Sequence, residues 1–170
     1  PESFLLAEYP QLGFNYRMTD IQAAVGCAQM DRAPDILACR AQVASRYNEA
    51  LSELSWLRRP STPTGYVHGN QAYVCLFAPD EPTPSNVEIL SRARSDLMRS
   101  LEQAGIATRQ GTHAPVLADY YARKYSIRPE QYPNAWLAEG LSLALPLYPQ
   151  MTLEEQYFVC EMLAEFGADL

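Results

Sequence analysis

The chain has 170 residues, of which 48% are hydrophobic and 19% charged, and its formal net charge at pH 7 is −7. This length and balance suit one globular domain, residues 1–170, with a real core. The acidic charge argues against nucleic acid or an anionic membrane as a partner. No apolar run reaches the roughly 18 residues of a transmembrane helix, and no secretory signal is visible.

The amino-terminal part of the chain predicts an extended arm followed by helices. Residues 1–18 contain proline and glycine and predict irregular structure. Thr19 begins a helix, because Gln22 follows three residues later in a capping-box pattern. A second helix is expected to start near Pro34, since proline suits a first helical turn, and to run to about Leu54.

The middle of the chain predicts a loop, two strands and a helix. Residues 55–70 are rich in proline and glycine and predict a loop, and the apolar run 72–78 predicts a buried strand. A helix is strongest over residues 95–104, where Gly105 would end it. Residues 106–109 then predict a second, short strand.

The last third predicts two short helices, at 117–124 and 134–139, and a third strand at 141–145. The final helix would begin at Thr152, whose partner Glu155 completes another capping box, and end near residue 167. Together these elements predict an α+β fold in which helices cover a small sheet.

Four cysteines, at positions 27, 39, 75 and 160, are scattered in apolar contexts without a CxxC pair. They predict buried, reduced thiols, no metal site and a cytoplasmic location.

Asn15 and Arg17 are the first candidates for ligand binding. Their alternation in Asn-Tyr-Arg puts both side chains on one side of an extended backbone, just ahead of a helix start. Two such donors suit a phosphate or carboxylate. The alternative is a turn residue, Asn15, beside a solvated surface charge, Arg17.

A second group of candidates follows the predicted strand 106–109. Arg109 and His113 enter a glycine-containing loop, which is a common place for ligand contacts. A lone histidine is more often structural than functional, so that alternative stays open for His113. His68 precedes the buried strand, and a loop or strand-capping role is expected for it.

Three blocks of sequence, near 13–29, 105–113 and 143–155, occur in the order typical of one known family. The first reads Gly-Phe-Asn-Tyr-Arg-Met-Thr-Asp-Ile-Gln-Ala-Ala and closely resembles a signature of the DegT/StrS family of pyridoxal-phosphate sugar aminotransferases. The third resembles the family's Ser-Leu-Pro-Leu-x-Pro-x-Met-Thr pattern. After Pro115 the chain reads Val-Leu-Ala-Asp, where many members have Leu-His-x-Gln.

The resemblance implies the small C-terminal domain of a fold-type I transferase, with a short, mostly antiparallel sheet covered by helices and preceded by long helices. Residues 1–54 would be the arm and helices leading from a large domain, and 55–170 the small α+β domain. The family acts as dimers with pyridoxal phosphate and transfers an amino group, here expected from glutamate, to a keto-sugar nucleotide.

The same resemblance implies a role for each candidate residue. Asn15 would bind the cofactor phosphate of the neighbouring subunit. Arg17, Arg109 and His113 would contact the nucleotide-sugar substrate.

Such an enzyme also needs a lysine that forms a Schiff base with the cofactor. Lys124 is the only lysine in the chain, and its context, Tyr-Ala-Arg-Lys-Tyr, predicts an exposed helix position. We therefore expect a C-terminal fragment that is inactive by itself. The alternative is a non-catalytic binding or oligomerisation module derived from such an enzyme.

Overall fold

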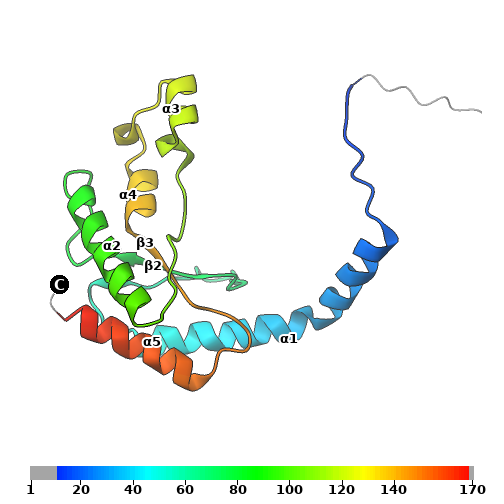
Figure 1. Ribbon diagram of the computed structural model, residues 1–170, viewed down its shortest axis with the longest axis horizontal. Coiled ribbons are helices and arrows are strands. Elements are labelled where there is room, and N and C mark those ends of the chain that lie inside the picture. The colour runs from blue at the N-terminus through cyan, green and yellow to red at the C-terminus, as the bar shows by residue number, and fades with distance from the viewer. Residues whose placement is uncertain (1–10, 169–170) are drawn as a thin grey trace, which may run out of the picture. The chain divides into compact units, whose positions relative to one another are not determined.

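The computed structural model describes residues 11–168, which form two compact units, one up to Pro34 and one from Asp35 onward. Its elements, labelled in Figure 1, are α1 (Asp20–Ala50), β1 (Leu57–Arg58), β2 (Tyr73–Phe77), α2 (Val87–Gln103), α3 (Asp119–Tyr125), α4 (Pro133–Leu141), β3 (Ser142–Leu145) and α5 (Leu153–Phe166), with 3₁₀ turns η1 (Pro115–Leu117) and η2 (Pro129–Gln131). Among the described residues, no helix combines the length and apolarity needed to cross a bilayer.

The first unit contains the arm from residue 11 and the first half of α1. The predicted capping box at Thr19 is confirmed, since the Gln22 N–H donates to Thr19 Oγ1 at 3.3 Å and the Thr19 N–H donates to Gln22 Oε1 at 3.0 Å. The predicted helix boundary at Pro34 is wrong, because α1 continues through it. Proline removes one helical donor, and the helix that follows is buried through Val43, Ala44 and Tyr47.

The second unit contains a three-stranded antiparallel sheet in the order β1-β2-β3. The α+β class and the short antiparallel sheet are therefore confirmed. The predicted strand at 106–109 is wrong: only Arg109 pairs, in a single bridge with Ala144. β1 was expected to be loop, because two residues are too few to show an alternating pattern.

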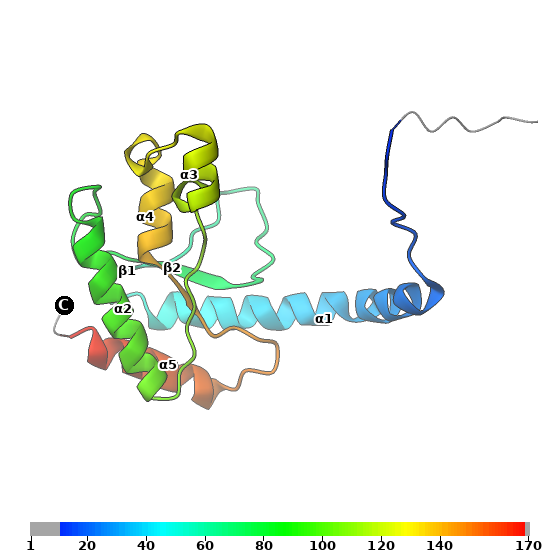
Figure 2. The same cartoon turned by 45° about the horizontal axis from the view of Figure 1, so that its top comes forward.

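Helices enclose the sheet of the second unit. In Figures 1 and 2, α5 lies alongside the second half of α1, and the Gln156 amide donates to the Val43 carbonyl at 2.7 Å between them. α2 ends as predicted at Gly105, whose φ is +83°. The N–H groups of Gly105 and Ile106 donate back to Glu102 and Leu101 at 2.9 and 2.8 Å, which is a Schellman motif.

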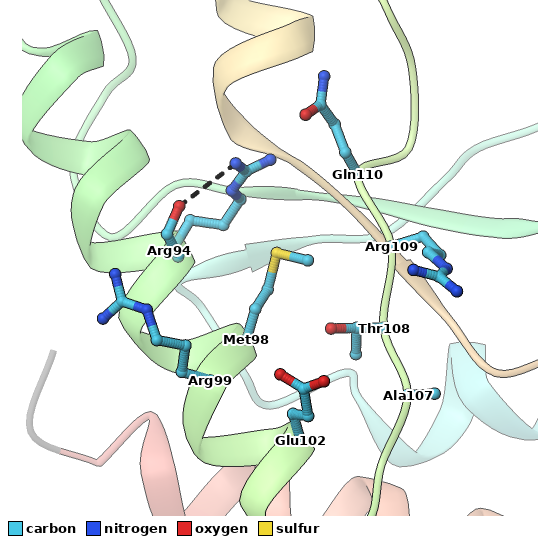
Figure 3. A pocket seen from close by; sticks show the side chains of 9 residues that line it. Arg94, Met98, Arg99, Glu102, Ala107, Thr108, Arg109 and Gln110 are labelled. Carbon is cyan, nitrogen blue, oxygen red and sulfur yellow. Dashed lines mark hydrogen bonds between the residues drawn. The ribbon is translucent and has the colours of Figure 1, made fainter.

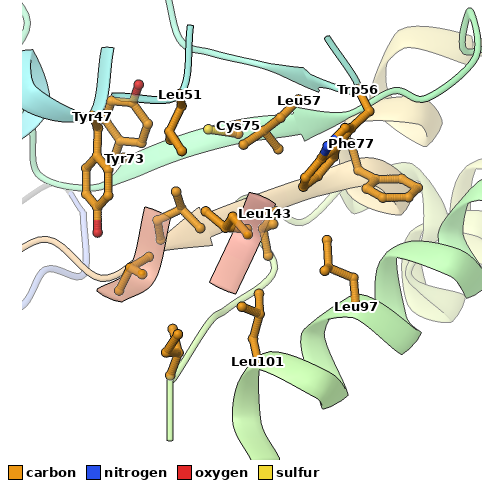
Figure 4. Close-up of a cluster of buried hydrophobic side chains, with 14 of the residues drawn as sticks. Tyr47, Leu51, Trp56, Leu57, Tyr73, Cys75, Phe77, Leu97, Leu101 and Leu143 are labelled. Atoms are coloured by element: carbon orange, nitrogen blue, oxygen red, sulfur yellow. The ribbon is translucent and has the colours of Figure 1, made fainter. Parts of the chain in front are cut away.

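The core of the second unit joins the sheet to α1, α2 and α5. Figure 4 shows its largest side chains, which include Tyr47, Leu51, Tyr73, Phe77, Leu101 and Leu143. The Tyr47 hydroxyl donates to the Pro146 carbonyl at 2.9 Å, and burial raises the pKa of that hydroxyl. The second half of α1 is thus part of this core.

The cysteines are free, but they are not uniformly buried as expected. Only Cys75 is buried, and its burial raises the thiol pKa to about 12. Cys39 and Cys160 are half-buried, and Cys27 is exposed on the first half of α1. An apolar local sequence does not ensure burial, because burial needs a partner element to cover that face.

Candidate functional site

Asn15 and Arg17 lie together in the first unit, in the extended segment before α1. The Arg17 N–H donates to Asn15 Oδ1 at 3.2 Å. This bond occupies the amide oxygen of Asn15 and leaves its Nδ2 group as a donor. Both side chains are exposed. An open hollow of about 420 Å³ is lined by Asn15, Tyr16, Arg17, Met18 and Gln22.

The donors around this hollow belong mainly to side chains. The capping box at Thr19 uses the Thr19 and Gln22 N–H groups within the helix start itself. Within residues 11–168, Arg17 takes part in no ion pair. An anion at this place would therefore meet the Asn15 amide and the Arg17 guanidinium, two donors of the kind that phosphate prefers.

Arg109 and His113 lie in the second unit, on the segment that follows α2. The backbone of Arg109 is fixed by its bridge to Ala144, where the two N–H···O distances are 3.2 and 2.7 Å. Its side chain is exposed and, in Figure 3, directed away from α2, whereas Thr108 is turned toward it. A hollow of about 370 Å³ lies between α2 and residues 107–110.

His113 is also exposed, at the end of a loop that is attached to β3. The N–H groups of Gly111 and Thr112 both donate to Ser142 Oγ, at 3.1 and 3.2 Å. The Ala114 N–H donates to the Glu139 carboxylate. The histidine side chain therefore extends from a backbone that is held on both sides of it.

Sequence reasoning missed Arg94, a residue of α2 that is 7% exposed. Its guanidinium reaches the junction between α4 and β3. Its Nη1 donates to the Ser142 carbonyl at 2.9 Å. Burial lowers the pKa of this guanidinium, and nearby Glu139 opposes that shift. The sequence could have predicted that Arg94 is buried, because it occupies an inward position in the helical series of Leu90, Leu97 and Leu101.

The other two sequence candidates lie away from these groups of residues. His68 is exposed in the loop before β2, and its Nδ1 accepts the Asn70 N–H at 2.9 Å. Lys124 is exposed on α3, as predicted, where its Nζ donates to the Tyr120 hydroxyl at 3.1 Å and lies over the Tyr125 ring. Nothing around Lys124 resembles the desolvated pocket of a reactive amine.

Comparison with known proteins agrees with the resemblance seen in the three sequence blocks. The family model of the DegT/DnrJ/EryC1/StrS aminotransferases matches residues 3–164. The chain belongs to this family. An uncharacterized protein of Methanocaldococcus jannaschii is 29% identical over 146 residues, covering 85% of this chain and 36% of the relative. A GDP-perosamine synthase of Escherichia coli O157:H7 is 27% identical over 161 residues, covering 93% and 39%.

Solved structures of the family share the fold. The putative sugar aminotransferase Spr1654 of Streptococcus pneumoniae superimposes with a TM-score of 0.77 at 23% identity, over 89% of this chain and 36% of that one. It was solved in pyridoxal-phosphate and pyridoxamine-phosphate forms as well as the apo form. The family member described here thus spans little more than a third of the length of the curated relatives it matches.

Proposed function

We propose that this chain supplies cofactor-binding and substrate-binding residues to a sugar aminotransferase. The enzyme would transfer an amino group, from glutamate as the expected donor, to a keto-sugar nucleotide. Family membership and the sugar-synthase and sugar-aminotransferase names of its relatives support this reaction class. The chain covers only 36–39% of those curated relatives, and its three sequence blocks resemble the C-terminal part of such an enzyme, which we infer it to be.

The Asn15–Arg17 pair carries the proposal. Its donor groups fit a phosphate, since the Asn15 amide oxygen is already used and the Arg17 guanidinium is exposed. We assign Asn15 to the phosphate of pyridoxal phosphate and Arg17 to an acidic group of the substrate. When bound, the cofactor supplies the electron-withdrawing chemistry of amino-group transfer; these side chains would only bind and orient.

The chain has no residue that fits the covalent part of cofactor binding. Lys124, its only lysine, is exposed and held against tyrosine rings. We infer that the Schiff-base lysine lies on polypeptide outside these 170 residues, and that the isolated chain is inactive.

Arg109 and His113 would contact the sugar nucleotide from the second unit. Both are exposed polar side chains on a backbone segment that is fixed to β3. A guanidinium suits a diphosphate, and an imidazole suits a sugar oxygen.

The experiment uses the enzyme that contains this chain. Asn15→Ala should weaken pyridoxal-phosphate binding by roughly tenfold, because it removes a hydrogen bond to a charged group. Arg17→Gln should raise the KM for the sugar nucleotide by a similar factor. The control is Arg32→Gln, which removes another exposed arginine of the first unit. Unchanged affinities in both test variants would overturn the assignment.

We also propose that the enzyme is a cytoplasmic homodimer. Free cysteines fit a reducing compartment. In the first unit, Ile21 and Val25 lie four residues apart on α1 with exposed fractions of 79% and 59%, an apolar face that a second copy could cover. Sedimentation velocity should show a dimer for the wild type and a weaker one for the double variant Ile21→Gln/Val25→Gln. A wild-type monomer at high concentration would refute the proposal.

A further inference from the structure

We propose that Ser142 and Arg94 are positioning residues, which fix the loop 110–114 so that His113 is presented to the sugar nucleotide. This inference rests on the proposed function, because it gives a purpose to the backbone behind one of the substrate contacts. We assign neither residue a contact with substrate or cofactor.

The first observation is the hydroxyl of Ser142, which serves two backbone donors at once. It accepts the Gly111 N–H at 3.1 Å and the Thr112 N–H at 3.2 Å, from a side chain that is only 3% exposed. Gly111 makes this approach possible. A Cβ at that position would overlap Val74 Cγ1 and lie 3.0 Å from Ser142 Cβ. The loop therefore rests directly on the sheet.

The second observation is the buried guanidinium of Arg94. Its Nη1 donates to the carbonyl groups of Ser142, at 2.9 Å, and of Glu139, at 3.4 Å. Arg94 belongs to no ion pair within the described residues, and its buried Nε has no hydrogen-bond partner there. Burying a cation in this way is costly. Its one bond closer than 3.4 Å, to the Ser142 carbonyl, fixes the junction between α4 and β3.

The third observation is that the loop is tied to this junction on both sides of His113. Thr112 precedes it and donates to Ser142, and Ala114 follows it and donates to the Glu139 carboxylate. The backbone of His113 is thus held between two anchors, while its ring is exposed. This arrangement fixes the origin of the side chain and leaves its polar atoms to a ligand.

The side-chain amide of Gln110 bears on which nitrogen of the His113 ring can donate a hydrogen bond. Gln110 Nε2 donates to the Thr112 carbonyl at 2.8 Å, which identifies that atom as the amide nitrogen, since a carbonyl can only accept. The same nitrogen lies 3.4 Å from His113 Nδ1. A neutral ring that accepts from this nitrogen at Nδ1 carries its hydrogen on Nε2. His113 would donate that hydrogen to an oxygen of the substrate.

The first test measures the loop in the 170-residue chain itself, by amide hydrogen exchange over residues 110–114. Ser142→Ala should speed exchange of the Gly111 and Thr112 amides on the order of tenfold, the loss expected for one buried bond. Ser142→Thr retains the hydroxyl and should restore slow exchange. The matched control is Ser100→Ala, a half-buried serine of α2. Equal exchange in Ser142→Ala and Ser100→Ala would overturn the proposal.

The second test asks whether the anchor acts through His113, in the enzyme that contains the chain. Ser142→Ala should raise the KM for the sugar nucleotide roughly fivefold with kcat unchanged, because it loosens binding and not chemistry. Adding Ser142→Ala to His113→Ala should raise KM no further. An additive effect of the two substitutions would overturn the positioning role. A wild-type enzyme that does not bind sugar nucleotides would instead refute the proposed function, and the exchange measurement would still decide the loop.

Arg94→Met provides an independent variant, because methionine fills similar space without a donor. It should reproduce both the faster exchange of Gly111 and Thr112 and the raised KM, since Ser142 would lose the bond that holds its carbonyl. Slow exchange in a folded Arg94→Met chain would remove Arg94 from the proposal.

Discussion

Single residues decide where the loop before η1 lies. Gly111 is half-buried and lies against Val74 and Ser142, and its hydrogen atom is the only side chain that fits. Ser142 uses one hydroxyl for two backbone donors and so joins that loop to β3. Both residues are small because the loop backbone and the sheet are in direct contact.

Gly111→Ala should therefore destabilise the chain by about 1–3 kcal/mol, the cost of forcing a methyl group into a filled space. Urea unfolding of the 170-residue chain would measure this change. Gly69→Ala is the matched control, since a Cβ at Gly69 meets nothing within 4 Å and should change stability by less than about 0.5 kcal/mol. Equal stability of the two variants would contradict the close packing at Gly111.

At the scale of elements, helix ends are set by local chemistry and helix faces by their partners. The start of α5 is closed by Thr152 and Glu155, whose carboxylate accepts the Thr152 N–H at 2.8 Å while the Glu155 N–H donates to Thr152 Oγ1 at 3.1 Å. The hydrogen bond from the Thr152 N–H lowers the pKa of the Glu155 carboxyl below its usual 4.5, and a hydrogen bond from the Tyr148 hydroxyl lowers it further.

A lowered carboxyl pKa makes stability depend on pH with a definite sign. The contribution of Glu155 is fully present above pH 4.5 and is lost as the pH falls through its lower folded-state value. Glu155→Gln retains a capping acceptor but does not titrate. The melting temperature of the wild type should thus fall more steeply than that of Glu155→Gln as the pH drops from 5 to about 3. Parallel curves for the two proteins would disprove the assignment.

At the scale of the whole molecule, the two units differ in what they bury. The second unit has a continuous core, from Tyr47 through Leu101 to Leu163. In the first unit, the described apolar side chains are largely exposed, among them Leu12, Phe14, Tyr16, Met18 and Ile21. The exposed apolar side chains of the first unit fit a surface that other polypeptide covers. This agrees with the proposed function.

The isolated chain should consequently form no covalent bond with pyridoxal phosphate. Borohydride treatment after mixing, followed by mass spectrometry, should find no adduct on Lys124, whose amine is exposed on α3 and held by Tyr120. Lys124→Arg is the control and should give the same absorbance spectrum as the wild type. A trapped cofactor on Lys124 would refute the proposed division of the active site.

The family, the caps and the buried strand could be predicted from the sequence. The capping pairs at Thr19 and Thr152 and the stop at Gly105 depend on residues within a few positions of one another. The strand at 73–77 is marked by a run of large apolar residues. The candidates Asn15, Arg17, Arg109 and His113 came from local motifs, and their roles stay predictions.

Other features were decided only by the tertiary structure, because they depend on partners far away in the sequence. β1 exists through its pairing with β2, and residues 106–109 are not a strand, because Arg109 alone meets Ala144. α1 continues through Pro34, where the local sequence rule places a helix start. The bonds from Gly111 and Arg94 to Ser142 join positions 31 and 48 residues apart. Sequence spacing encodes which side chains share a face, but the fold decides what that face meets.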